Sequence, residues 1–263
     1  MNANEADDNY VEDIITTTPS NPLLEEISCH LKKHGFYCLE KSLDLKALSA
    51  FQKEVESLIG AKGKRYFSLI NPYKNIESKF ALLDKSCNLK KFLFELAKSG
   101  TDSDVSNSEI LNVLRIVAGK NTDGQSLKFH YDATVITALI PIFIPIGSIE
   151  HSGHLLAYKN LRNIRKSLLV NLIEKIILQN SISQKIISFL AFRKIENYIC
   201  ELKEGNIYFF YGYRTLHANL PVNPDYVRAT LLFHFGNPHN DSYLIKQSTK
   251  FRHWREKINF KYS

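Results

Sequence analysis

The chain has 263 residues, 44% of them hydrophobic, which is enough to bury a substantial core within one domain. Pro141 and Pro145 interrupt the longest apolar run, so no segment reaches the roughly 20 apolar residues that a membrane-spanning helix needs. The first residues, MNANEADDNYVED, lack the basic and then apolar pattern of a secretory signal. The four cysteines are far apart and form no CxxC pair, which predicts reduced thiols and a cytoplasmic location.

The formal net charge of +7 is concentrated in two segments. Residues 159–203 contain nine Lys or Arg against three Glu, and residues 246–263 contain six against one. Residues 1–27, in contrast, contain seven acids and no base. Such a concentration of bases is either a solvated surface or a patch for an anionic partner, and composition alone does not choose between the two.

Helical patterns occupy the first part of the chain. Residues 1–21 are acidic and rich in Asn, Thr and Ser, which predicts a flexible arm. Apolar residues then recur at helical spacing in 22–34, 43–60 and 90–100, and a short strand is expected at 35–40. We therefore expect a helical layer over residues 22–100.

Strand patterns follow from residue 109 onward. The segments 109–119, 127–145, 153–158, 206–211 and 228–238 are rich in β-branched and aromatic residues and are separated by Gly and Pro turn signals. A helical block separates the third of them from the fourth. This order predicts one α+β domain at 22–263, mostly β, with its core at 109–238, a helical insertion at 159–200 and a basic tail at 246–263.

Two polar residues stand at the start of the apolar segment KFHYDATVITALIPIFIP. His130 and Asp132 are two apart, so on a strand they share a face and can be a hydrogen-bonded pair, a catalytic pair or two metal ligands. His217 follows a later strand pattern, and it reaches them if the sheet folds over as in a double-sheet jelly roll. Two imidazoles and a carboxylate on neighbouring strands form the facial triad of non-haem Fe(II) oxygenases, which leaves metal sites open for a chelating co-substrate and O₂.

In this order the residues resemble the Fe(II)/2-oxoglutarate-dependent dioxygenases, and among them the phytanoyl-CoA dioxygenase-like branch. The likeness covers residues 109–238 and rests on four features: the HxD of His130 and Asp132, the distal His217, Arg228 eleven positions later, and a GxL element at 153–155. The resemblance implies a double-stranded β-helix, or cupin-like jelly roll. In it, His130, Asp132 and His217 would hold Fe(II), with 2-oxoglutarate and O₂ as co-substrates.

The resemblance also implies roles for residues around the metal. Arg228 would bind the distal carboxylate of 2-oxoglutarate, which suits the planar fork of a guanidinium, and Thr230 and Asn219 would assist it. The candidates for substrate contacts are Arg115, Asn112 and Lys128. Arg115, on the strand before the HxD pair, could instead hold the co-substrate.

The nature of the substrate depends on the basic insertion. Its apolar stripe predicts a helix packed on the barrel, and its bases predict a lid or a surface that rests on the anionic inner face of a membrane. We expect hydroxylation of an aliphatic C–H in a small or lipid-linked anionic substrate, since related halogenases lack the carboxylate that Asp132 supplies. The hydroxylases of the lipopolysaccharide sugar Kdo are a specific resemblance. A free amino acid or an acyl intermediate of secondary metabolism stays open.

Three other classes of protein fit parts of the pattern. The basic composition suits a nucleic-acid binder, but no RNP, helix-turn-helix, zinc-finger or KH signature is present, so no nucleic-acid partner is expected. A ligand-binding jelly roll without catalysis would leave Asp132 as an unpaired carboxylate in a pocket. A zinc hydrolase could use the same three ligands but would not need Arg228.

Overall fold

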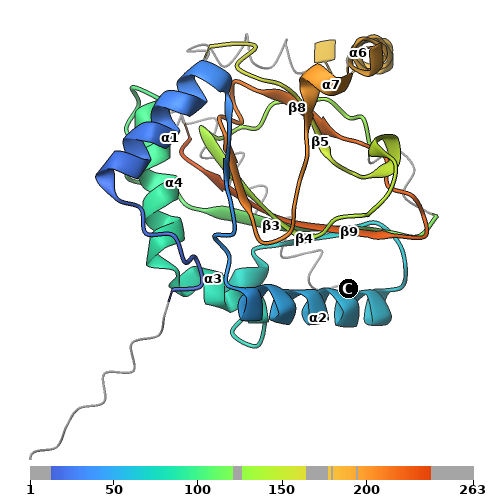
Figure 1. Cartoon of the computed structure of the whole chain (residues 1–263), viewed down its shortest axis with the longest axis horizontal. Coiled ribbons are helices and arrows are strands. Elements are labelled where there is room, and N and C mark those ends of the chain that lie inside the picture. Colours follow the sequence, from blue (N-terminus) through green and yellow to red (C-terminus); the bar gives the residue numbers. More distant parts are fainter. Residues whose placement is uncertain (1–12, 121–125, 164–176, 179, 194, 238–263) are drawn as a thin grey trace, which may run out of the picture.

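The computed structural model describes residues 13–120, 126–163, 177–178, 180–193 and 195–237. At its centre, two antiparallel sheets face each other, and helices cover the outer side of the larger one (Figure 1). This arrangement confirms the expected α+β class with a jelly-roll core.

The larger sheet contains β1 (Phe36–Leu39), β2 (Phe67–Ile70), β3 (Leu111–Ala118), β4 (Ile136–Phe143), β7 (Ile207–Phe210) and β9 (Val227–Phe235), in the order β1-β7-β4-β9-β3-β2. The smaller sheet contains β5 (Leu155–Tyr158), β6 (Ile199–Cys200) and β8 (Leu216–Asn219), in the order β6-β5-β8. Sequence patterns did not predict β2 or β8.

The helical layer consists of α1 (Asn21–His34), α2 (Leu45–Lys62), α3 (Leu82–Lys85) and α4 (Cys87–Gly100), with 3₁₀ turns η1 (Pro72–Lys74) and η2 (Lys79–Ala81). Helix α1 is followed by Gly35, whose φ of 75° is a left-handed conformation that favours glycine and terminates the helix. Asp44 caps the start of helix α2, since its carboxylate accepts the Ala47 N–H. Buried residues such as Leu31, Phe51 and Phe92 face the core, so the predicted helical layer is present.

The two faces of β9 have different environments. Ala229, Leu231, Phe233 and Phe235 belong to the core between the larger sheet and the helices. The alternate residues face the smaller sheet, and Leu232 packs there with Leu155 of β5. Arg228, Thr230 and His234 lie on this same inner face. The alternation of β9 thus separates a packing face from a face that lines the interior of the barrel.

Residues 13–20 pack on the domain, although sequence analysis assigned them to a flexible arm. Ile15 is fully buried and forms a β-bridge with Leu43. The carboxylate of Asp13 accepts the Asn88 N–H at 2.8 Å and the Ser86 hydroxyl at 2.5 Å, at the start of α4. These contacts correct the boundary that was expected at residue 21. Residues 1–12 lie outside the described residues.

Part of the expected insertion is described as α6 (Ser181–Arg193) and α7 (Ile195–Tyr198), which lie beside the smaller sheet (Figure 1). A further 3₁₀ turn, η3 (Ile149–His151), precedes β5. Residues 164–176 of the insertion and the basic tail at 246–263 are outside the described residues. Within the described ranges, no helix combines the length and the apolar character that crossing a membrane requires.

Candidate metal centre

The HxD pair lies in an extended segment before β4, and not inside the strand, which begins at Ile136. This segment runs beside β8: the N–H groups of His130 and His217 each donate to the other residue's carbonyl at 3.0 Å. The Asp132 N–H donates to the carbonyl of Gly212, also at 3.0 Å. Main-chain pairing therefore brings the HxD segment and the distal His together, as the sequence predicted, although without a regular strand at the HxD itself.

The three predicted metal ligands converge in space. Nε2 of His130 lies 3.8 Å from Oδ1 of Asp132, and Nε2 of His217 lies 3.7 Å from the same oxygen. One donor atom from each residue lies within 4.8 Å of the other two. The side chains of Asp132 and His217 are 8% and 5% exposed, whereas that of His130 is 32% exposed, so the centre is open on the His130 side.

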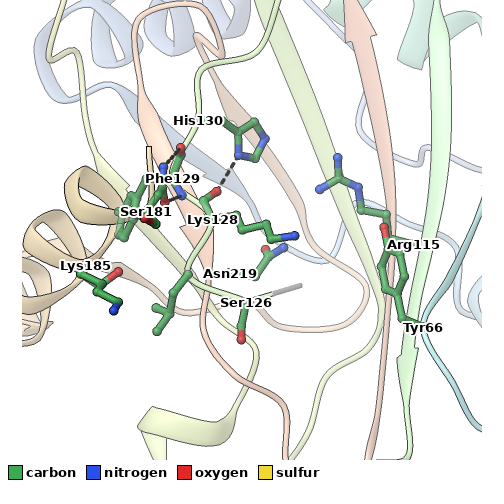
Figure 2. A pocket seen from close by; sticks show the side chains of 12 residues that line it. Tyr66, Arg115, Ser126, Lys128, Phe129, His130, Ser181, Lys185 and Asn219 are labelled. Carbon is green, nitrogen blue, oxygen red and sulfur yellow. Dashed lines mark hydrogen bonds between the residues drawn. The ribbon is translucent and has the colours of Figure 1, made fainter. Parts of the chain in front are cut away.

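Backbone carbonyls orient both imidazole rings. Nδ1 of His130 lies 2.9 Å from the carbonyl of Lys128, a hydrogen bond drawn in Figure 2. Nδ1 of His217 lies 3.0 Å from the carbonyl of Thr215. A carbonyl only accepts hydrogen bonds, so the proton of each neutral ring lies on Nδ1, and the lone pair of Nε2 points to the common space. This is the arrangement in which His binds a metal ion.

Buried polar groups set the charge of the carboxylate. The Thr137 hydroxyl donates to Oδ2 of Asp132 at 2.6 Å, and Nδ1 of His234 lies 3.6 Å from that oxygen. Burial by itself raises the pKa of Asp132, but His217, His234, His130 and the Thr137 hydrogen bond together hold it well below its usual range. Burial lowers the pKa of His217 to about 4. The centre thus combines an ionised carboxylate with a neutral imidazole, the protonation states that metal ligands need.

Gly212 makes room for the carboxylate. A Cβ at this position would lie 2.4 Å from Oδ2 and 2.7 Å from Cβ of Asp132, and 2.7 Å from the hydroxyl oxygen of Thr137. Only a residue without a side chain allows this approach. Neither Gly212 nor Thr137 was predicted as a site residue, because both act through the position of the Asp132 carboxylate, which becomes fixed only when β4 and β7 pair.

Arg228 is a fully buried cation, 1% exposed, on the inner face of β9. Its Nε donates to the carbonyl of Gly153 at 2.6 Å, one terminal nitrogen to Oδ1 of Asn219 at 2.8 Å, and the other to the Thr230 hydroxyl at 3.3 Å. Burial, with a further contribution from the charge of Arg115, lowers the pKa of Arg228 to about 9. Within the described residues, no carboxylate forms an ion pair with it, so its charge is not neutralised.

The structure explains why the GxL element begins with glycine. Gly153 has a φ of 66°, and a Cβ there would lie 2.4 Å from Cδ of Arg228. Glycine is therefore required both by the backbone conformation and by the path of the Arg228 side chain.

A cavity of about 890 Å³ opens beside His130, and Arg115, Lys128 and Asn219 are among its lining residues. Arg115 extends from β3 toward Lys128 and Asn219, with His130 at one end of the space (Figure 2). A smaller, adjoining cavity shares Arg115 and Asn219 and reaches Arg228. The two adjoining cavities thus lead from the candidate ligand His130 to the buried guanidinium.

One predicted substrate residue is not in this space. Asn112 and Arg115 both belong to β3, but they are three positions apart and therefore face opposite sides of the sheet. Asn112 pairs with Phe233 on the side of the helices, and its Nδ2 donates to the carbonyl of Leu232 at 3.0 Å. The prediction for Asn112 is wrong for this geometric reason.

The two facing sheets, with helices on the outer side of the larger one, define a jelly-roll fold that oxygenases of known structure share. A prolyl hydroxylase from Trichoplax adhaerens is similar with a TM-score of 0.56 and 11% identity, over 82% of this chain and 90% of that chain. A prolyl 4-hydroxylase from Phytophthora capsici has a TM-score of 0.55 and 14% identity, over 89% and 72%. The epimerase SnoN, solved with Fe³⁺ and alpha-ketoglutarate, has a TM-score of 0.52 and 12% identity, over 82% and 85%.

No protein-family model matches the chain, and no curated protein sequence matches it either. At the identities given above, the structural similarity establishes the fold alone.

Proposed function

We propose that this protein is an Fe(II)- and 2-oxoglutarate-dependent oxygenase that hydroxylates an aliphatic C–H bond. One observation carries the proposal: three convergent metal donors share the barrel interior with a buried guanidinium that, among the described residues, has no carboxylate partner. The epimerase SnoN, which has a similar fold, binds iron and alpha-ketoglutarate. A metal site alone would also suit a hydrolase, but a zinc hydrolase would not need the buried guanidinium of Arg228.

The donor set fits a divalent iron ion. His130, Asp132 and His217 would hold Fe(II) on one side and leave the other side to the cavity. When bound, iron supplies the site at which O₂ is activated at the expense of 2-oxoglutarate. Protein side chains exclude water from the side of the centre opposite the cavity. There the ring of Phe210 lies edge-on to His217 at a centroid distance of 5.0 Å and covers that imidazole.

Arg228 would bind the distal carboxylate of 2-oxoglutarate. Its three neutral hydrogen-bond partners fix the orientation of the guanidinium but leave its positive charge for a ligand. Asn219 and Thr230, each bonded to a different terminal nitrogen, would act as positioning residues for this fork.

The finer features of the proposal concern the substrate. Placement in the phytanoyl-CoA dioxygenase-like branch rests on the order of the HxD pair, the distal His, Arg228 and the GxL element, whose glycine leaves space for the Arg228 side chain. Arg115 and Lys128 in the cavity support an anionic substrate, for which the Kdo sugar of lipopolysaccharide is one candidate. Contact of the basic insertion with an anionic membrane at the inner face would suit a lipid-linked form. A free amino acid or an acyl intermediate is the alternative within the same reaction class.

Anaerobic addition of Fe(II) and 2-oxoglutarate tests the reaction class. The expected result is a weak visible absorption band from the chelate, followed by formation of succinate when O₂ is admitted. His217→Ala should abolish both signals, and His151→Ala, which changes an exposed histidine outside the ligand set, should keep both. If the wild-type protein gives no band, or if the band persists in His217→Ala, the proposed centre is wrong.

A further inference from the structure

The cavity beside His130 is lined by basic and hydroxyl groups. Within the described part of the chain, its lining contains no Asp or Glu. Three of the lining side chains carry a positive charge, namely Arg115, Lys128 and Lys185. Four others carry a hydroxyl, namely Tyr66, Ser126, Ser181 and Ser188. Such a lining does not suit an apolar substrate, because burying it against an acyl chain would leave these groups without partners.

The three cations come from different elements. Arg115 belongs to β3, Lys128 precedes the metal ligand His130, and Lys185 belongs to α6 (Figure 2). Within the described residues, no carboxylate oxygen lies within 4.0 Å of any of the three charged groups. Like charges around one space repel each other, so the cavity favours a ligand that places negative charge between them.

Helix α6 is held in position by the amide of Gln184, by a hydrogen bond from the Tyr158 hydroxyl to the Ile187 carbonyl at 3.3 Å, and by the buried Ala191. Oε1 of Gln184 accepts the Phe129 N–H at 2.7 Å, and its Nε2 donates to the Phe129 carbonyl at 2.8 Å. Phe129 immediately precedes His130. The next residue of the helix, Lys185, lines the cavity, and Ser181 and Ser188 lie near it because residues three and four apart share a helix face. The helix is thus a fixed wall of the cavity.

We propose that this cavity binds a substrate with at least two anionic groups and several hydroxyls, in the class of phosphorylated or carboxylated sugars. One anionic group would lie at Arg115 and Lys128, and the other at Lys185. That the ligand is a substrate rests on the proposed function, but its binding does not. Arg228 is not in the lining of this cavity; it lines the adjoining cavity, which shares Arg115 and Asn219 with the first.

Calorimetric titration of the metal-free full chain tests the binding. Fructose 1,6-bisphosphate serves as the probe with two charges, and fructose serves as the neutral probe of the same skeleton. We expect the bisphosphate to bind and fructose not to bind, and we expect affinity for the bisphosphate to fall as salt is added. Arg115→Gln and Lys185→Gln should each weaken it by about ten-fold, since each removes one charge-assisted contact. Arg193→Gln removes an exposed charge of α6 outside the cavity lining and should change the affinity less than two-fold, or about 0.4 kcal/mol.

The outcomes separate this inference from the proposed function. Asp132→Asn, which changes a metal ligand outside the cavity lining, should abolish the iron and 2-oxoglutarate signals but keep the bisphosphate affinity, so either proposal can fail alone. Absence of bisphosphate binding, equal binding of fructose, or an equal effect of Arg193→Gln and Lys185→Gln would overturn the inference.

A separate experiment tests whether the anionic ligand is part of a lipid. Vesicles of phosphatidylcholine containing one third phosphatidylglycerol should co-sediment the wild-type chain if the anion is part of a lipid, and Lys185→Gln should then reduce the co-sedimented fraction. Binding of the soluble bisphosphate without co-sedimentation assigns a soluble sugar. Loss of both kinds of binding would leave the polyanion site without support.

Discussion

Arg228→Met separates a ligand-binding cation from a structural one. Methionine fills much of the same volume, and it removes both the charge and the three hydrogen bonds to Gly153, Asn219 and Thr230. If the guanidinium serves to bind an anion, its loss should change the stability of the metal-free protein only slightly. The affinity for 2-oxoglutarate should fall strongly.

The expected change in stability follows from two opposing contributions. Burial lowers the pKa of Arg228 to about 9, and at about 1.4 kcal/mol per pKa unit, keeping this charge in the folded state costs about 5 kcal/mol. Its three hydrogen bonds stabilise the folded state by about 1.5 kcal/mol each, or roughly 4 to 5 kcal/mol in total. The two nearly cancel, so Arg228→Met should change the free energy of unfolding by less than about 2 kcal/mol in either direction.

Two measurements check this reasoning. Urea denaturation of the metal-free protein gives the free energy of unfolding, and calorimetry with 2-oxoglutarate on the Zn(II)-loaded protein gives the affinity without turnover. The affinity should fall by about 30-fold or more, which corresponds to at least about 2 kcal/mol for a lost buried charge pair. Arg228→Lys retains the charge without the fork and should lie between wild type and Arg228→Met in affinity.

A loss of stability above about 4 kcal/mol, together with an unchanged affinity for 2-oxoglutarate, would refute the reasoning. The guanidinium would then be a structural group whose hydrogen bonds join β9 to the turn before β5, and the fold would need no anion at this position.

Three further changes have definite expected outcomes. Gly212→Ala should displace the carboxylate of Asp132 and weaken Zn(II) binding by about 10- to 100-fold in calorimetry while circular dichroism stays native; unchanged affinity would show that the site tolerates a Cβ. Because the pKa of His217 is lowered to about 4, the unfolded chain binds the extra proton first, so the metal-free protein should lose up to about 3 kcal/mol of stability as pH falls from 6.5 to 4, as followed by urea denaturation. His217→Gln should remove this part of the pH dependence, and a dependence that persists would assign it to other groups. Gln184→Leu breaks both hydrogen bonds to Phe129 and should weaken bisphosphate binding about five-fold in calorimetry, whereas unchanged binding would mean that α6 needs no such attachment.

Sequence patterns predicted the long helices, most of the strands and the three residues that converge. Long amphipathic segments specify α1, α2 and α4 because their apolar residues repeat over several turns. The convergence of the HxD pair with His217 followed from the motif order and the expected jelly roll. The face of Asn112 was also accessible from sequence, since its odd separation from Arg115 on one strand places the two on opposite sides.

Other features could not be read from the sequence. The need for glycine at position 212 arises from a carboxylate that is distant along the chain, and no local pattern encodes that approach. The attachment of α6 through Gln184 could not be predicted either. This amide is one of several polar residues of the helix, and its role depends on the backbone of Phe129, which is 55 residues earlier in the chain. The expected arm boundary was wrong because the buried side chain of Ile15 and the hydrogen bonds of Asp13 to the start of α4 together anchor a segment whose composition is mostly polar.

The imidazoles of His130 and His217 are both aimed by carbonyl oxygens of their own chain, two residues upstream. Every amino acid supplies such an oxygen, so the chemical identity of residues 128 and 215 has little influence on how the rings point. Mutation can therefore remodel the surroundings of the centre, and with them the choice of substrate, while the aim of the two rings is inherited from the path of the main chain. A scaffold built in this way can drift far in sequence and retain the same centre.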